Sequence, residues 1–468
     1  MKLAHVLDGT GKAARDIQLD YFTHLDTNWR SCRIHGLAGP PGIGKSFIAR
    51  TVQRTYNDVA IITTNNLLVD QYCETYPELV AIKGKDYYAD EREYRMARKE
   101  ALYSPCVFNP LSYYYFFLSN PHAVRPSTVV IDEAHKLGEM MLMTISKAFP
   151  LDTYSIPQDL DDEGFFYWLE DQVKKLGRFY HPDSPHQNKR RDFLSRRYEA
   201  LILLYNYLKT NLHTVKIFYE MRETKPNKRR MHLVVQPLVM PADLLTTIFG
   251  PTTKILLMSG SLTEFHLEEL FPKEKAIDFK NYEPLAPPEN RPVDFKPLRN
   301  RKELAEMANT IRTIYENENR PNTIVHTSYR QAKELAPLLK DISVLVHDKE
   351  TKYDVLDKFK KDGGILLACG MAEGVDLPGD ACRLIIIPRL LFPNLGDQAV
   401  KKRLALPNGQ LWYDLETIMT TVQQIGRGVR SATDSCTTYM LDPLFPKVID
   451  KTRRYLTKGF LEAIQWQR

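Results

Sequence analysis

The sequence is poor in cysteine and lacks any apolar run long enough to suggest a membrane span. Only six of its 468 residues are cysteine, and no two of them form a C-x-x-C pair. Neither a zinc site nor a disulfide framework is therefore expected. The N-terminus also lacks the apolar stretch of a signal peptide. We expect a cytoplasmic, reducing setting without membrane contact.

Charge of one sign is not in large excess either. The 64 basic residues exceed the 58 acidic ones by 6, which is compatible with a polyanionic partner but does not identify one. An apolar content of 43% and a charged content of 26% are ordinary for a globular protein. The length suffices for two to four domains, and no internal repeat or low-complexity tract is present.

Two regions alternate short apolar strands with amphipathic helices. Strands are expected at residues 34–38, 59–64, 127–132 and 254–259 in the first region, and at 323–327, 343–346, 364–368, 383–387 and 438–442 in the second. A connector with five prolines between residues 284 and 297 separates the two regions. Strands of this kind linked by helices predict parallel sheets covered on both faces. The fold class expected is therefore α/β.

Residues 139–235 interrupt this pattern and favour helices, for example at 165–176 and 193–212. A strand pattern returns at 232–236, so the helical stretch is interpreted as an insertion into the first sheet domain. The expected division is residues 1–138 plus 236–285 for the first lobe, 139–235 for the insertion, and 286–468 for the second lobe.

A phosphate-binding loop lies between the first expected strand and the helix that follows it. Residues 39–46 match G-x-x-x-x-G-K-[ST] in the strand–helix context that this motif requires. Gly39, Gly42 and Gly44 allow backbone N–H groups to face phosphates at a helix N-terminus. Lys45 is expected to neutralise the β- and γ-phosphates, and Ser46 to ligate Mg²⁺.

Two further motifs complete the chemistry of nucleotide hydrolysis. Asp132 and Glu133 end an apolar strand, where Asp132 is expected to hold Mg²⁺ and Glu133 to polarise the attacking water. Gln423, Arg427 and Arg430 come from the second lobe. The arginines are three residues apart, which predicts that they share one face of a helix and stabilise charge on the transferred phosphoryl group. Together these motifs indicate ATP hydrolysis in a cleft between two lobes.

The order of these motifs resembles the XPD/DinG family of superfamily 2 DNA helicases over nearly the whole chain. The most specific matches are residues 372–380, 384–393 and 423–434. Similar segments are 63–71 for motif Ia, 83–88 for the Lys-Gly-Arg-x-Asn-Tyr element, 259–262 for motif III and 15–18 for the adenine-reading Q motif.

The resemblance implies two RecA-like motor lobes and an arch-like helical insertion under which a DNA strand passes. It implies a monomer that uses ATP and Mg²⁺ to move 5′→3′ on single-stranded DNA and to unwind tailed duplexes, with replication, repair or defence proteins as partners. It places Gln18 and Asp376 at the nucleotide. The DNA contacts that it implies are Thr63, Thr64, Ser328, Tyr329, Lys189, Arg190 and Arg191.

The chain departs from the family at the iron–sulfur cluster. Family members usually hold a 4Fe–4S cluster on four cysteines, but Asp90 stands at the first of these positions and Cys106 is the one cysteine between Tyr88 and Asp132. No cluster and a reduced strand-separating wedge are therefore predicted. A reduced member of this kind suits a phage or mobile element acting in a bacterial cytoplasm.

Three other functions stay open. An RNA helicase also uses an Asp-Glu-Ala-His box, and stimulation of ATP hydrolysis by RNA rather than DNA would identify one. A clamp or recruitment subunit that hydrolyses ATP without unwinding fits the missing cluster. A hexameric AAA+ ATPase is disfavoured by the second α/β region.

Overall fold

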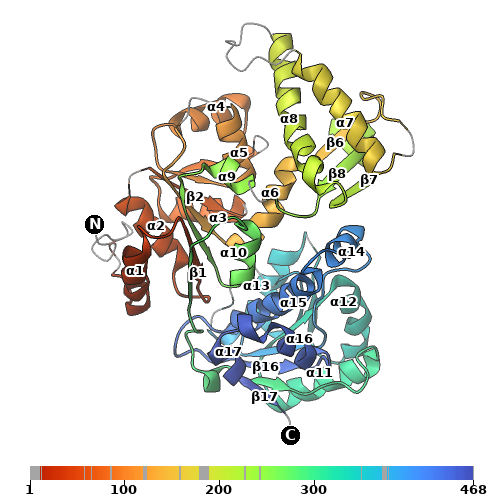
Figure 1. Cartoon of the computed structure of the whole chain (residues 1–468). Coiled ribbons are helices and arrows are strands. Elements are labelled where there is room, and N and C mark those ends of the chain that lie inside the picture. The colour runs from red at the N-terminus through yellow and green to blue at the C-terminus, as the bar shows by residue number, and fades with distance from the viewer. Residues whose placement is uncertain are drawn as a thin grey trace.

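The computed structural model describes residues 11, 13–56, 58–64, 66–84, 87–119, 124–157, 160–178, 189–225, 228–241, 244–348, 350–371, 377 and 379–466. Two lobes lie one above the other, with a third, smaller unit beside the upper one (Figure 1). Among the described residues, no helix is long and apolar enough to cross a membrane.

The first lobe contains a seven-stranded parallel sheet in the order β10-β1-β9-β5-β2-β4-β3. Its strands are β1 (Ile34–Ala38), β2 (Val59–Thr63), β3 (Val80–Ile82), β4 (Cys106–Phe108), β5 (Thr128–Asp132), β9 (Lys254–Ser259) and β10 (Ile277–Asn281). The central strands β1, β2 and β5 are buried at every residue, because helices cover both faces. This double burial explains their unbroken apolar sequences.

The helices of this lobe precede, follow or connect the strands of the sheet. They are α1 (Asp16–Asn28), α2 (Lys45–Thr55), α3 (Asn66–Thr75), α4 (Glu91–Glu100), α5 (Pro110–Ser119), the 3₁₀ turn η3 (Ala134–Lys136), α6 (Leu137–Ile145), α9 (Leu244–Phe249) and α10 (Glu264–Leu270). Side chains of one sheet face, such as Leu37 and Val130, pack with α1 to α3. Alternate residues such as Ile34 and Ile131 pack into the core on the other face.

The second lobe repeats this architecture with the strand order β13-β14-β12-β15-β16-β11-β17, again all parallel. The strands are β11 (Val293–Phe295), β12 (Asn322–Thr327), β13 (Val344–Val346), β14 (Gly364–Cys369), β15 (Leu384–Ile387), β16 (Thr437–Met440) and β17 (Ile464–Trp466). The helices are α11 (Leu304–Glu318), α12 (Tyr329–Leu335), α13 (Lys352–Asp362), α14 (Gln398–Leu404), α15 (Gly409–Ile425), α16 (Phe445–Thr452) and α17 (Lys458–Glu462). Short 3₁₀ turns are η4 (Pro288–Asn290), η5 (Ala336–Leu339), η6 (Gly379–Ala381), η7 (Gly426–Gly428) and η8 (Arg453–Tyr455). Two RecA-like α/β lobes are thus present, as the sequence predicted.

The insertion corrects one expectation. Besides α7 (Asp162–Gly177) and α8 (Lys189–Asn211), it contains an antiparallel sheet in the order β6-β8-β7, formed by β6 (Lys147–Pro150), β7 (Val215–Lys225) and β8 (Lys228–Pro237). Helices alone were expected there, and the strand pattern at residues 232–236, expected to mark the return to the first sheet domain, lies in β8 of this sheet. The strand β7 has one solvated face, so its apolar residues only alternate, and this pattern is weaker than an unbroken apolar run.

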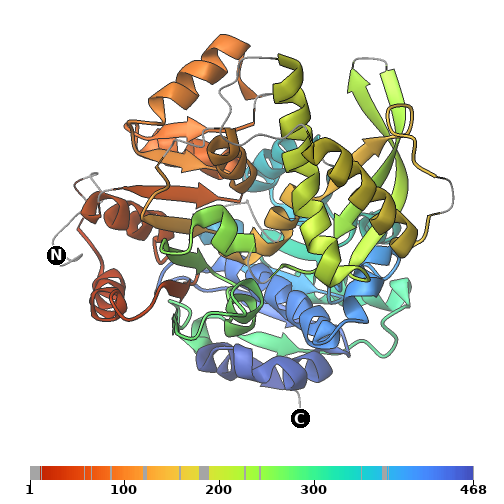
Figure 2. The same cartoon turned by 45° about the horizontal axis from the view of Figure 1, so that its top comes forward.

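The insertion also contacts the second lobe through α14 (Figures 1 and 2). Lys216 Nζ lies 2.7 Å from Asp397 Oδ1 at the start of α14. Lys402 Nζ donates to the Val215 carbonyl at 2.7 Å, and Arg403 pairs with Glu269 of α10. One short helix therefore touches the insertion and both lobes.

Candidate nucleotide site between the two lobes

The phosphate-binding loop lies at the carboxyl end of β1 and leads directly into α2. Gly42 has a φ of +84° and Gly44 a φ of +85°, in the left-handed region that favours glycine. A Cβ at Gly44 would lie 2.4 Å from Gln18 Nε2, so a side chain there would displace Gln18. Helix α2 begins at Lys45, and its first N–H groups are available to an anion.

Helix α1 holds this loop from one side. Gln18 is buried, and its Nε2 donates to the Ile43 carbonyl at 2.8 Å. The Arg15 guanidinium donates to the Gly42 carbonyl at 2.6 Å. Gln18, predicted to contact adenine, thus binds the loop backbone, and its contact with the base stays a prediction. Arg15 had no predicted role, although it stands in the same Arg15-Asp-Ile-Gln18 string.

The two acids at the end of β5 differ in their surroundings. Asp132 is buried, and burial followed by the neighbouring Glu133 charge raises its pKa to about 6. Its Oδ1 accepts from the Glu133 N–H, and its Oδ2 accepts from the Tyr72 hydroxyl, both at 3.0 Å. Glu133 is more exposed, and its Oε1 lies 3.7 Å from Lys45 Nζ. Its φ of +53° is unusual for a residue other than glycine.

The Ser259 hydroxyl, at the end of β9, connects Glu133 to the rest of the site. It lies 2.7 Å from His135 Nδ1 and donates to Glu133 Oε2 at 3.2 Å. It also accepts from the Ser261 N–H at 3.2 Å. Ser259 is fully buried, so these contacts are shielded from water.

Gln423 of the second lobe reaches the same group. Its Nε2 donates to Ser261 Oγ at 2.8 Å and lies 3.5 Å from His135 Nε2. One set of proton positions satisfies the contacts: His135 carries its proton on Nδ1 and donates to Ser259, while its Nε2 faces Gln423. A continuous chain of polar contacts then runs from the second lobe to the Glu133 carboxylate.

The arginines correct a second expectation. Helix α15 ends at Ile425, Arg427 lies in the 3₁₀ turn η7, and the backbone is extended at Val429. Arg427 and Arg430 therefore do not share a helix face. Gly428, in the turn that follows the helix, packs on Cys436 so closely that a Cβ there would lie 2.3 Å from its Sγ.

Arg430 nevertheless lies directly against the phosphate-binding loop. A Cβ at Gly42 would be 2.1 Å from the Arg430 carbonyl oxygen. The Arg430 N–H is held by Asp434 Oδ2 at 2.8 Å. The charge of Arg427 contributes, after burial, to lowering the pKa of His326 to about 3. The structure thus brings the Gln423–Arg430 segment to the loop, as a site between lobes requires.

Four of the residues predicted to contact DNA, Thr63, Thr64, Ser328 and Tyr329, lie at the carboxyl ends of β2 and β12. Thr63 pairs in register with Asp132, and both Thr63 and Thr64 are buried. Ser328 caps α12 by accepting from the Gln331 N–H at 3.2 Å, and Tyr329 is 39% exposed. Asp376 and the side chains of Lys189, Arg190 and Arg191 lie outside the described part of the chain.

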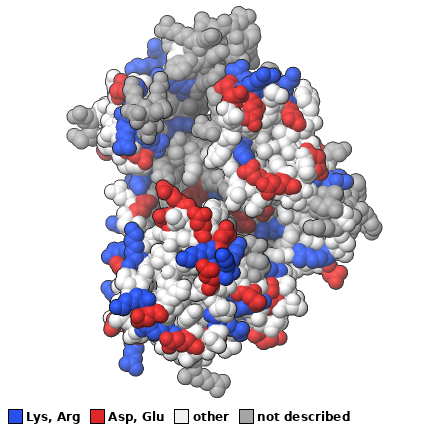
Figure 3. All heavy atoms as spheres, turned by 180° about the vertical axis from the view of Figure 1, so that it is seen from behind, with Lys and Arg blue, Asp and Glu red and all other residues white. Residues whose placement is uncertain are grey.

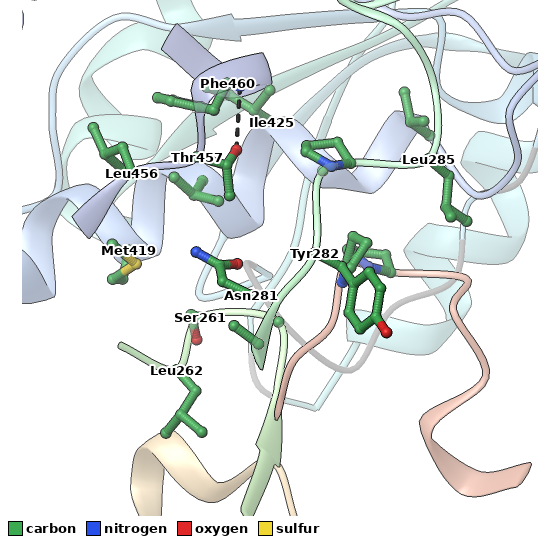
Figure 4. A pocket seen from close by; sticks show the side chains of 18 of the residues that line it. Ser261, Leu262, Asn281, Tyr282, Leu285, Met419, Ile425, Leu456, Thr457 and Phe460 are labelled. Carbon is green, nitrogen blue, oxygen red and sulfur yellow. Dashed lines mark hydrogen bonds between the residues drawn. The ribbon is translucent and has the colours of Figure 1, made fainter. Parts of the chain in front are cut away.

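A pocket opens beside the phosphate-binding loop, between the lobes (Figure 4). It encloses about 780 Å³, part of it continuous with solvent. Its lining is mostly apolar and comes from both lobes and the connector: Pro40, Pro41, Ser261, Leu262, Tyr282, Leu285, Met419, Ile425, Leu456, Thr457 and Phe460. The lobes therefore meet through the loop, Ser261 and Gln423 and leave space beside these contacts.

The described residues fit Mg²⁺ and a nucleoside triphosphate. Ser46 is exposed at the start of α2 and Asp132 is a carboxylate, so both offer the hard oxygen ligands that Mg²⁺ prefers. The glycine loop, the N–H groups of α2 and Lys45 suit the phosphates. Within the described residues, no cluster of three or more His, Cys, Asp or Glu is arranged for a metal ion. Such a cluster is not needed, because Mg²⁺ in these sites is held by few protein ligands and the phosphates.

Comparisons with known proteins agree with this architecture. Residues 311–462 match the model of the helicase C-terminal domain. The ATP-dependent DNA helicase YoaA of Haemophilus influenzae is 30% identical over 122 residues, covering 24% of this chain and 19% of that protein. Its Escherichia coli namesake is 29% identical over 140 residues, covering 28% and 22%.

The alignments thus span only 19% and 22% of the length of these relatives. A solved structure named XPD_Helicase shares the fold over 95% of this chain and 98% of its own, with a TM-score of 0.60 at 16% identity. The C-terminal region is thus similar to helicases of the XPD/DinG-like kind, and the two-lobe fold is similar to that of the XPD structure.

Proposed function

We propose that this protein is an ATP- and Mg²⁺-dependent DNA helicase that moves 5′→3′ on single-stranded DNA and unwinds tailed duplexes. The observation that carries the proposal is the contact of Gln423 with Ser261 and His135 across the lobes. Through Ser259 this contact reaches Glu133, so the position of the second lobe is linked to the carboxylate beside Lys45. A motor needs such a link between hydrolysis and lobe movement.

Each side chain then has a role in hydrolysis. Lys45 would neutralise the β- and γ-phosphates, and Ser46 and Asp132 would hold Mg²⁺, which would supply further neutralisation of the phosphate charge. Glu133 orients and polarises the attacking water. Arg427 and Arg430 stabilise negative charge on the transferred group when the lobes close. Asp376 positions one of these arginines.

The DNA strand is proposed to cross the ends of β2 and β12 and to pass beside the insertion. Thr63, Thr64, Ser328 and Tyr329 stand at these strand ends, and the cluster 189–191 begins α8. On the face seen in Figure 3, Lys and Arg side chains gather on the rims of a recess in the upper half of the molecule. Helix α4 carries the basic residues Arg92, Arg95, Arg98 and Lys99. Contacts of this kind to phosphates weaken as salt rises.

The test is ATP-dependent unwinding of a duplex with either a 5′ or a 3′ single-stranded tail. The variants are Lys45→Ala and, as a matched control, Lys340→Ala, which removes an exposed lysine far from the loop in the chain. We expect unwinding of the 5′-tailed substrate alone, abolished by Lys45→Ala and kept in the control. Unwinding from the 3′ tail would overturn the proposed polarity.

Two outcomes would replace the helicase with another function. ATP hydrolysis stimulated by DNA, but without strand separation on either substrate, would identify a translocase or clamp, as the short α4 segment in place of a cluster domain favours. Stimulation by RNA and not by DNA would identify an RNA helicase. If the affinity for single-stranded DNA is the same at low and high salt, the proposed contacts between basic side chains and phosphates are excluded.

A further inference from the structure

Tyr72 occupies a position that the mechanism above does not use. It lies on α3 and is 3% exposed, with its hydroxyl 3.0 Å from Asp132 Oδ2. The two residues are 60 positions apart in the sequence. Buried tyrosine hydroxyls usually have a polar partner, and here that partner is the carboxylate expected to hold Mg²⁺.

The hydrogen bonds on Asp132 determine how its carboxylate is oriented. Oδ1 accepts the Glu133 N–H and Oδ2 accepts the Tyr72 hydroxyl, so each oxygen is held by one donor. A carboxylate oxygen has two acceptor sites, so one site on each oxygen is left for another ligand. The donor to Oδ1 is the backbone N–H of the next residue in the chain, whereas the donor to Oδ2 is Tyr72, on a separate helix.

Helix α3 is itself fixed in place, which gives the Tyr72 hydroxyl a defined position. At its first residue, Asn66 Oδ1 accepts from Asn109 Nδ2 at 2.7 Å. One turn later, Asp70 pairs with Lys83. The Tyr72 ring packs beside Tyr76, with centroids 6.3 Å apart. The hydroxyl is therefore presented from a rigid element, as is typical of groups that orient a metal ligand.

We propose that Tyr72 is a positioning residue for Mg²⁺, because its hydroxyl holds Asp132 in the orientation that binds the ion. The inference rests on the proposed function of Asp132. Residues that hydrogen-bond to metal ligands typically change metal affinity by about 10- to 100-fold when they are replaced. Tyr72→Phe removes one oxygen and keeps the ring, so it is expected to weaken metal binding by about this factor.

The experiment measures Mn²⁺ binding to the full chain in the presence of ADP, from the loss of the free-ion signal in electron paramagnetic resonance. Binding of ADP without metal is measured separately with a fluorescent ADP analogue. We expect Tyr72→Phe to lower Mn²⁺ affinity about 10- to 100-fold and to leave metal-free ADP affinity unchanged. Equal Mn²⁺ affinity in Tyr72→Phe and wild type would overturn the inference.

Tyr113→Phe is the matched control. Tyr113 is fully buried in the same lobe, and within the described residues its hydroxyl has no hydrogen-bond partner. Its replacement is expected to leave Mn²⁺ affinity unchanged. A loss equal to that of Tyr72→Phe would mean that any change in the buried tyrosines of this lobe weakens the site, and the specific role of Tyr72 would be lost.

A double-mutant cycle with Asp132→Asn keeps the test decisive if Tyr72→Phe lowers stability. Thermal unfolding reports that loss separately. If the hydroxyl acts through Asp132, adding Tyr72→Phe to Asp132→Asn causes no further loss of Mn²⁺ affinity. Additive losses would overturn the inference. If wild type itself binds no Mn²⁺ with ADP, or binds it as well after Asp132→Asn, the assignment of Asp132 fails instead.

Discussion

Replacing Ser259 with alanine tests the link between the second lobe and Glu133. The change deletes the hydroxyl that donates to Glu133 Oε2 at 3.2 Å and contacts His135 Nδ1 at 2.7 Å. It leaves the surrounding strand β9 intact, because alanine fits where serine did. The prediction therefore concerns the orientation of the Glu133 carboxylate, proposed to activate water, rather than folding of the lobe.

The size of the effect follows from the lost hydrogen bonds. A hydrogen bond to a charged group contributes about 1.5 to 3 kcal/mol, which is about 10- to 100-fold in rate if the whole of it is used in the transition state. The Glu133 side chain is 28% exposed, so water replaces part of the lost bond. We therefore expect the lower end, a fall of about 10-fold in kcat.

The assay is DNA-stimulated ATP hydrolysis, with nucleotide affinity measured separately. Ser259→Ala is expected to lower kcat and to leave nucleotide affinity unchanged, because Ser259 does not belong to the phosphate-binding loop. Ser431→Ala, an exposed serine of the second lobe, serves as control. A kcat within twofold of wild type would refute the reasoning, since Glu133 would then be oriented without the hydroxyl.

Two further predictions concern other contacts of the site. Gly42→Ala places a Cβ 2.1 Å from the Arg430 carbonyl oxygen, so the lobes must separate by on the order of 1 Å and kcat should fall about 100-fold. Gly250→Ala, which shares a positive φ of +110° far from the loop in the chain, separates backbone strain from this clash, and an equal loss in both variants would contradict the prediction. His266 Nδ1 accepts from the Thr263 N–H, and burial, then the charge of His135, lowers the pKa of His266 from 6.5 to about 4. Between these two pKa values His266 is protonated in the unfolded chain but neutral in the folded protein. The free energy of unfolding should therefore fall by about 2 kcal/mol between pH 7 and pH 5. His266→Gln, which keeps a capping side chain, should lose that part of the pH dependence in denaturant unfolding, and an unchanged dependence would exclude His266 as its source.

Much of the fold and the loop could be predicted from the sequence because the signals are local. The buried strands β1, β2 and β5 have unbroken apolar runs, since helices cover both of their faces. The glycine spacing of residues 39–46 predicts a phosphate loop, and the structure shows why Gly42 and Gly44 are needed at positive φ. In each case neighbouring residues carry the information.

Predictions from local residue spacing were wrong where the structure depends on packing between distant segments. Arg427 and Arg430 have helical spacing, but α15 ends at Ile425 and residues 426–428 form a 3₁₀ turn. The alternating residues of β7 indicated no strand until β8 was seen to pair with it. A half-solvated strand and a helix end are decided by partners that the local pattern does not contain.

The sequence by itself determined the two α/β lobes, the phosphate loop and the order of the helicase motifs. Tertiary structure alone decided that Tyr72 meets Asp132 and that Gln423 reaches Ser261, 162 residues away in the chain. The physical reason is that periodicity reports which face of an element is buried, whereas a hydrogen bond between distant side chains depends on how whole elements pack.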